Sequence, residues 1–237
     1  MSNFILVPGA WLGAWAWKDV AVSLEERGHR AIPVSLTGMG GVVKPFEDIG
    51  LEDAIGDVLS AIESGGLTDV VLVGHSFACK VAAAAADRVP DRINTVIYLD
   101  GMAPAETGEP QGGTESDEFK VEGMKIPFPP EFLDEAAPDV RGSMRDMLVA
   151  KAEPCPVRYF REAYTLSVGY DSVREAFIYC LQGDTLPWLL SDRKEGESDD
   201  AVLRRKLGGP FRMIDAGHYP MLTMPEALAE ALVELKK

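Results

Sequence analysis

The segment Asp69–Pro90, DVVLVGHSFACKVAAAAADRVP, decides the fold. It begins with a continuous apolar run, which predicts a buried strand of a parallel sheet. Gly74 then allows a sharp turn, and the alanine-rich run after it predicts a helix that ends before Pro90. This order of strand, turn and helix places Ser76 at the tip of the turn, where a nucleophilic hydroxyl would be exposed. A serine that only caps the helix is the alternative interpretation.

The same alternation of apolar strands and helical patterns continues on both sides of this segment. The expected strands are NFILV, RAIPVSL, DVVLVG, INTVIYLD, REAFIYC and FRMID. This pattern predicts an α/β fold with a mostly parallel sheet of about six strands and helices on both faces. From about residue 102 to 166 the alternation stops, and Pro, Gly, Glu and aromatic residues become frequent. We therefore expect a core made of residues 1–101 and 167–237, with an insertion at 102–166 above the carboxyl edge of the sheet.

Composition excludes several classes of function. The 237 residues carry a formal net charge of -15, which argues against nucleic acid because phosphate binding needs clustered Lys and Arg. The same charge favours neutral over anionic substrates. We expect no signal peptide and no membrane span. Three cysteines without paired spacing predict free thiols rather than disulfides or a metal site, as in a cytoplasmic protein. The sequence leaves both a monomer and a homodimer open.

A serine nucleophile needs a base, and the chain has three histidines. His29 precedes a predicted strand and therefore lies at the opposite edge of the sheet. His75 adjoins Ser76 but projects differently, so we expect it to pack beside the turn. His218 follows the last predicted strand, at the same edge as Ser76, and is the candidate base. A structural loop histidine is the alternative for His218.

The carboxylate that would orient His218 has two candidates. Asp184 follows the strand REAFIYC, which precedes the strand of the histidine, and is the favoured acid. Asp100 ends the strand INTVIYLD at the same edge and is the alternative. Either residue could instead be a solvated or capping carboxylate.

Two backbone N–H groups are expected to bind the oxyanion that forms when a serine attacks a carbonyl group. One belongs to Phe77, at the start of the helix after Ser76. The other belongs to Ala10, in the glycine-containing loop after the first strand. Trp11 in the same loop is a candidate for the substrate pocket.

Several segments carry a resemblance to a known family. They are FILVPGAWLGAWAWKDVAVSLEERGHRAIPVSLTGMG, VVLVGHSFA, VIYLDGMAP, CLQGDTLP and AGHYPMLTMPEALAEAL. In this order they resemble the α/β-hydrolase superfamily, and more narrowly its small branch of plant methylesterases, hydroxynitrile lyases and bacterial esterase-like proteins. The resemblance implies an α/β-hydrolase fold, no metal or organic cofactor, and a cap at 102–166 that walls the substrate pocket.

This chain also departs from the pattern of that branch. The family's acid usually lies three positions after the residue that matches Cys180, where this chain has Gly183, so Asp184 is displaced by one. The lyases of the branch carry a threonine at the position of Gly9 and a lysine at that of Tyr219. With Trp11, these two positions are the expected pocket residues, and their identities favour an esterase over a lyase.

We therefore predict a serine carboxylesterase that cleaves a small neutral ester through an acyl-enzyme. One alternative is a lyase or a C–C bond hydrolase that uses the same triad. The other is a ligand-binding protein on a hydrolase scaffold.

Overall fold

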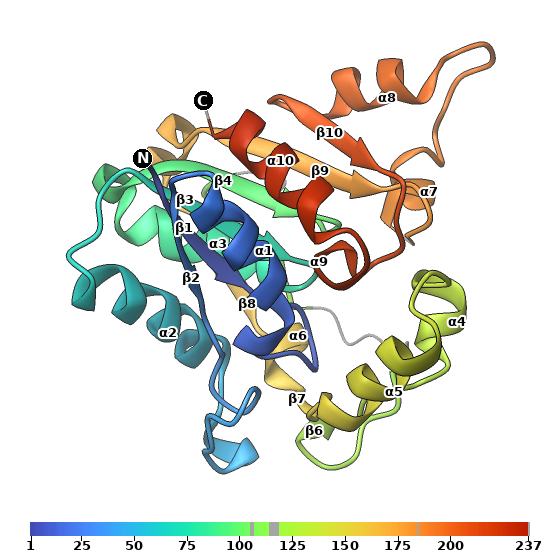
Figure 1. Ribbon diagram of the computed structural model, residues 1–237. Coiled ribbons are helices and arrows are strands. Elements are labelled where there is room, and N and C mark those ends of the chain that lie inside the picture. The colour runs from blue at the N-terminus through green and yellow to red at the C-terminus, as the bar shows by residue number, and fades with distance from the viewer. Residues whose placement is uncertain (105–106, 114–118, 184, 237) are drawn as a thin grey trace.

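The computed structural model describes residues 1–104, 107–113, 119–183 and 185–236. Its centre is a six-stranded sheet in the order β10-β9-β4-β3-β1-β2, with every neighbouring pair parallel (Figure 1). The strands are β1 (Asn3–Val7), β2 (Arg30–Pro33), β3 (Val70–His75), β4 (Ile93–Leu99), β9 (Glu175–Cys180) and β10 (Phe211–Ile214). Each corresponds to one of the strands expected from the sequence, and the predicted parallel α/β architecture is confirmed.

Helices cover both faces of this sheet because its strands are apolar on both faces. In β3, Val70 and Leu72 enter one core, whereas Val71 and Val73 enter the other. The first face is covered by α2 (Leu51–Ser64) and α3 (Ala78–Arg88), and the second by α1 (Lys18–Glu26) and α10 (Pro225–Leu235) (Figure 1). The other helices of the core are η1 (Ala14–Trp17), η2 (Phe46–Asp48), η3 (Pro90–Arg92), η4 (Val168–Ser172), α7 (Thr185–Leu189), α8 (Asp199–Lys206) and α9 (Pro220–Thr223).

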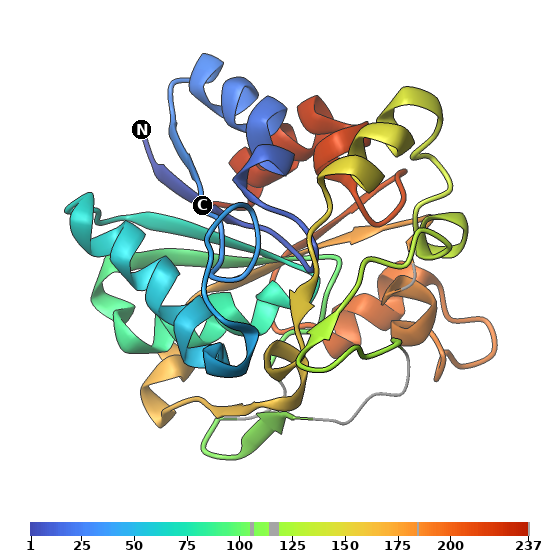
Figure 2. The ribbon, with the colours of Figure 1, turned by 90° about the horizontal axis from the view of Figure 1, so that it is seen from below.

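The segment between β4 and β9 is built from short elements. Two antiparallel pairs join β5 (Pro110–Gly112) to β8 (Ala163–Thr165) and β6 (Lys125–Ile126) to β7 (Cys155–Pro156). The helices are α4 (Phe132–Ala136), α5 (Gly142–Lys151) and α6 (Arg158–Arg161). In Figure 2, the green-to-yellow ribbon of this segment passes in front of the sheet. The proposed cap boundaries at residues 102 and 166 stay a prediction.

Trp11 connects this segment to the core. Its indole Nε1–H donates to the Ile126 carbonyl at 3.1 Å, and its own carbonyl accepts from the Glu153 N–H at 3.0 Å. The Trp11 ring also contacts Phe128 and Phe132, with ring centroids 5.5 and 5.8 Å away. A loop at the end of β1 therefore carries the contacts that hold the segment over the strand ends.

Candidate active site

Ser76 follows β3 directly and has a φ of +56°. For a residue other than glycine this conformation is strained, and it persists only where the surrounding structure imposes it. Here the helix α3 turns back onto the strand so closely that a Cβ on Gly74 would lie 2.5 Å from the Ala78 carbonyl oxygen. The Ser76 N–H is fixed by the Leu99 carbonyl of β4 at 2.9 Å. The strand, sharp turn and helix expected around Ser76 are all present.

Backbone strain is concentrated at this edge of the sheet. In the described part of the chain, four residues other than glycine have a positive φ, and three of them follow the ends of β1, β3 and β4. These three are Trp11, Ser76 and Asp100. Strained conformations of this kind cluster at functional sites because there they hold side chains in place. Three of the strand ends that carry predicted site residues, those of β1, β3 and β4, are therefore strained.

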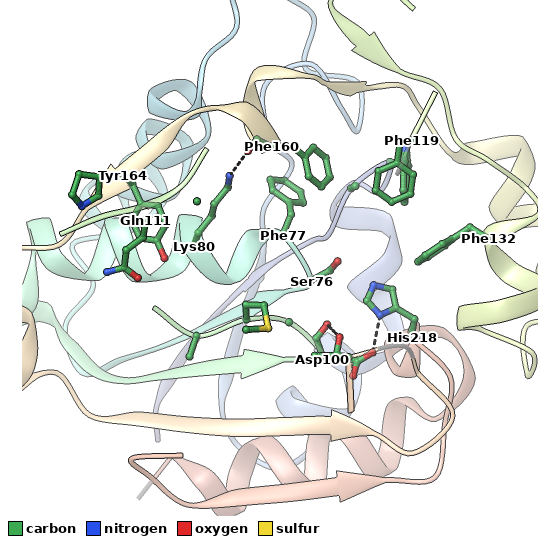
Figure 3. Close-up of a pocket in the computed structure, with 18 residues that line it drawn as sticks. Ser76, Phe77, Lys80, Asp100, Gln111, Phe119, Phe132, Phe160, Tyr164 and His218 are labelled. Atoms are coloured by element: carbon green, nitrogen blue, oxygen red, sulfur yellow. Dashed lines mark hydrogen bonds and ion pairs between the residues drawn. The ribbon is translucent and has the colours of Figure 1, made fainter. Parts of the chain in front are cut away.

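His218 and Asp100 form a buried pair beside Ser76. Nδ1 of His218 lies 2.7 Å from Oδ2 of Asp100, and the two residues are 4% and 0% exposed. A carboxylate at this distance favours the tautomer with hydrogen on Nδ1, which leaves the lone pair of Nε2 directed away from Asp100. In Figure 3 the Ser76 hydroxyl and the other edge of the His218 ring point toward one another. The arrangement suits a serine, a base and a carboxylate that orients the base.

The carboxylate that contacts His218 belongs to Asp100, which is the alternative candidate from the sequence. The favoured candidate, Asp184, lies outside the described residues. The second oxygen of Asp100, Oδ1, accepts from the Cys180 N–H of β9 at 3.1 Å. A Cβ on Gly183 would lie 2.5 Å from Asp100 Oδ2. The Asp100 carboxyl therefore occupies space that a side chain at position 183 would need. A glycine at this position and a carboxylate from the neighbouring strand fit one another.

The loop that carries His218 is fixed from three sides. The His218 N–H donates to the Ala136 carbonyl at 2.7 Å, and the Gly217 N–H donates to Asp139 Oδ2 at 2.9 Å. His75 is fully buried, and its Nε2–H donates to the His218 carbonyl at 2.8 Å. Burial, together with the nearby His218, holds the pKa of His75 well below its usual value. A neutral His75 therefore packs beside the turn, where the sequence places it, and supports the base.

Ala10 and Phe77 line the same cavity as Ser76. Within the described ranges, neither backbone N–H is hydrogen-bonded to another group of the protein. Backbone N–H groups in folded proteins are nearly all paired, so two free ones beside one serine are available to a ligand oxygen. Both are the groups expected from the sequence to bind an oxyanion.

The cavity has a volume of about 530 Å³ and a largely aromatic wall. Its aromatic lining residues are Trp11, Phe77, Phe119, Phe132, Phe160 and Tyr164. Phe132 of α4 lies edge-on to His218, with ring centroids 5.6 Å apart. Figure 3 shows Phe119 and Phe132 on the His218 side of Ser76, and Lys80, Gln111 and Tyr164 on the other side. The cavity is therefore apolar near the base and more polar at its far end.

Of the three pocket residues expected from the sequence, Trp11, Gly9 and Tyr219, one lines the cavity. Trp11 lines the cavity. Gly9 packs behind it against His75 and Ser76. Tyr219 is 1% exposed and turns into the core, because it follows His218 directly and neighbouring side chains point in different directions. Neither Gly9 nor Tyr219 is among the described residues that line the cavity.

Sequence reasoning missed Lys80 and Asp139. Lys80 lies four residues after Ser76, which is about one helical turn. This spacing could have indicated that Lys80 lies on the same side of the helix as the nucleophile. Asp139 had no such signal, because its contact with Gly217 joins distant parts of the chain.

Residues 4–231 match the sequence model of a family described as the Alpha/beta hydrolase family. The chain is 30% identical to a carbendazim hydrolyzing esterase of Nocardioides sp. (strain SG-4G), over 99% of this chain and 100% of that protein. It is 28% identical to methylesterase 9 of Arabidopsis thaliana, over 99% and 98% of the two chains. A solved extracellular alpha/beta-hydrolase from a Paenibacillus species has the same fold, with a TM-score of 0.79, 20% identity and 99% coverage of both chains.

Proposed function

The chain belongs to the alpha/beta hydrolase family, and from this premise we propose that it is a serine carboxylesterase that cleaves small esters through an acyl-enzyme. One observation carries the proposal: the strained Ser76, the His218–Asp100 pair and two free N–H groups surround a single cavity. A nucleophile, a base with its orienting carboxylate, and an oxyanion site are the parts that acyl transfer requires.

Acylation begins when Nε2 of His218 removes the proton from the Ser76 hydroxyl. Ser76 Oγ then forms a bond to the ester carbonyl carbon, and the carbonyl oxygen gains the negative charge. The N–H groups of Ala10 and Phe77 donate to that oxygen. Asp100 holds His218 in the required tautomer and stabilises its protonated form.

Collapse of this intermediate breaks the bond to the alkoxy group. His218 donates its proton to the departing alcohol, which leaves Ser76 acylated. Water then gives a proton to His218 and attacks the acyl carbon, and the carboxylic acid and free Ser76 are released. The same residues thus serve both halves of the reaction.

The substrate class follows from the relatives and from the cavity. Relatives named as methylesterases and as a carbendazim hydrolyzing esterase support a small ester with a short alcohol group. A cavity of about 530 Å³ with aromatic walls is in the range of small-molecule sites. The net charge of -15 favours neutral over anionic esters at long range.

The alternative functions have less support. A ligand-binding protein was suggested by the displaced acid, but Asp100 supplies a carboxylate to His218. A lyase or C–C bond hydrolase could use the same triad. The lyases of the resembled branch carry a lysine at the position of Tyr219. In this chain the Tyr219 side chain is buried behind His218 and is not among the described residues that line the cavity, so it supplies no such ammonium group there.

We propose a cytoplasmic enzyme, because the three cysteines are free and buried, as in proteins of reducing compartments. In the ranges that the structure describes, no helix is both long and apolar enough to cross a bilayer.

The proposal is tested by following the hydrolysis of a panel of methyl, ethyl and p-nitrophenyl esters. We expect Ser76→Ala and His218→Ala to lose turnover, while far-UV circular dichroism and thermal midpoint stay close to wild type. Ser64→Ala, an exposed serine at the end of α2, is the matched control and keeps full activity. Retained esterase activity in Ser76→Ala would falsify the proposal.

A further inference from the structure

Lys80 is a charged residue inside the cavity that the proposed mechanism does not use. It lies on α3 about one turn after Ser76 and lines the cavity between the aromatic residues. Among the described lining residues it carries the only lysine or arginine side chain. Burial disfavours an ammonium group and lowers the pKa of Lys80 to about 8. Burying an ammonium group among aromatic side chains has a desolvation penalty, so a lysine at this position is expected to have a function.

In the part of the chain that the structure describes, the Lys80 ammonium has one weak hydrogen bond. Nζ donates to the Phe160 carbonyl at a long distance of 3.4 Å. Over the described residues Lys80 enters no ion pair. The nearby Glu162 is already engaged, because it accepts from Arg158 and from the Leu51 N–H, each at 2.5 Å. An ammonium has three donors, so Lys80 keeps donors for a ligand in the cavity.

The position of Lys80 relative to His218 indicates which part of an ester it would meet. His218 protonates the departing alcohol, so the alkoxy group has to lie on the His218 side of Ser76. Figure 3 shows Lys80 and Gln111 on the opposite side of Ser76. The acyl portion of the ester therefore extends toward Lys80.

This inference rests on the proposed esterase function. We propose that Lys80 binds a carboxylate on the acyl portion of the substrate, so that the preferred substrates are short alkyl monoesters of dicarboxylic acids. The ammonium sets specificity, whereas the chemistry at Ser76 is unchanged. Gln111, on the same side of the cavity, adds polar surface there.

The acidic surface of the protein opposes this specificity only at long range, and only weakly. The net charge of -15 belongs to the whole chain, and salt screens exposed charges beyond about 8 Å at physiological ionic strength. Lys80 acts at contact distance in a half-buried site, where screening is weak. The positive charge inside the cavity therefore determines the substrate preference. It favours an anionic ester over the neutral ester expected from the surface charge.

The test compares four pairs of substrates, and the two members of each pair differ only in charge at the far end of the acyl chain. Each pair consists of the monomethyl ester of succinic, glutaric, adipic or pimelic acid and the same methyl ester with its free carboxyl group converted to a neutral amide. We expect wild type to prefer the acid over the amide in kcat/KM at the best chain length. Lys80→Met lowers that preference about 10- to 100-fold, mostly through KM, and Lys80→Arg retains most of it. Lys18→Met, which removes an exposed lysine outside the cavity, leaves the preference unchanged.

Two kinetic results would overturn the inference. One is a wild type that shows no preference for the acid at any chain length. The other is an equal loss on acid and amide in Lys80→Met, since Lys80 would then only hold the Phe160 carbonyl in place.

Calorimetric binding separates this inference from the proposed function. In Ser76→Ala, we expect the monoester to bind more tightly than its amide, and the added substitution Lys80→Met to abolish the difference. If wild type hydrolyses no ester, the esterase proposal fails, but this difference in binding would still establish the anion site. Equal binding of acid and amide would overturn the anion site whether or not esters are hydrolysed.

Discussion

The two hydrogen bonds of the Asp100 carboxylate determine what Asp100→Asn would do. Oδ1 accepts from the Cys180 N–H at 3.1 Å, and Oδ2 lies 2.7 Å from His218 Nδ1. Asparagine has one oxygen and one NH2 group in place of the two oxygens. Because a backbone N–H can only donate, the oxygen of Asn stays on Cys180 and the NH2 group faces His218.

This arrangement inverts the tautomer of the base. With a donor opposite it, Nδ1 of His218 has to accept, so the ring proton moves to Nε2. A protonated Nε2 cannot remove the proton of Ser76. In serine triads, this substitution lowers kcat about 10⁴-fold, which corresponds to about 5 kcal/mol of transition-state stabilisation. We expect a loss of this size here, with little change in KM, because Asn and Asp have nearly the same shape.

The assay is steady-state hydrolysis of the best methyl ester, with Asp184→Asn as the matched control. Asp184→Asn should keep activity within about 3-fold of wild type, because Asp100 already supplies the carboxylate on His218. The reasoning is refuted if Asp100→Asn keeps more than a tenth of the wild-type kcat, or if Asp184→Asn has the larger effect.

Three further substitutions have defined outcomes. Gly183→Ala puts a methyl group 2.5 Å from Asp100 Oδ2, so kcat should fall at least 10-fold, and unchanged kinetics would contradict the tight fit. Asp139→Ala removes the acceptor of the Gly217 N–H and should cost about 2 kcal/mol of unfolding free energy in urea denaturation, with a lower kcat; wild-type stability would argue against that anchor. Lys80→Met should raise the thermal midpoint at pH 7, because the folded state disfavours the charged lysine. This gain should shrink as the pH rises from about 8 toward 10.5, since wild-type Lys80 then loses its proton in the folded state first; a gain that does not depend on pH would point to packing instead.

The sheet could be predicted from the sequence because buried parallel strands are apolar at nearly every position. The strand VVLVGH is buried throughout, and the helical patterns between strands are long enough to cover both faces. Ser76 and His218 followed from the same pattern, since residues directly after parallel strands meet at one edge. The structure brings both residues to one cavity.

The acid was harder to predict because chain order and spatial order differ. Asp184 was favoured for following the strand before that of His218. In the sheet, however, β4 lies next to β9, so Asp100 at the end of β4 reaches the same place. Asp100 and His218 are 118 positions apart, and only the strand order makes them neighbours. Gly183 was a usable signal, because a glycine at the usual acid position leaves room for a carboxylate from elsewhere.

The pocket could be predicted only in part, because its far wall comes from the segment between β4 and β9. Trp11 was expected and lines the cavity, whereas Phe119 and Phe160 reach it through contacts that the local pattern does not reveal. The role of Lys80 depends on the same segment, since the Phe160 carbonyl is its hydrogen-bond partner. Short strands and helices with few apolar residues leave little periodicity from which to predict such a wall.

The central claim is that Ser76 is an activated nucleophile, and intact-mass spectrometry after treatment with a fluorophosphonate tests it most directly. The reagent forms a stable adduct with a serine whose proton is removed by a base. We predict one adduct per chain in wild type, none in Ser76→Ala and strongly slowed labelling in His218→Ala. A folded wild type that gains no adduct, or an adduct that persists in Ser76→Ala, would contradict the claim.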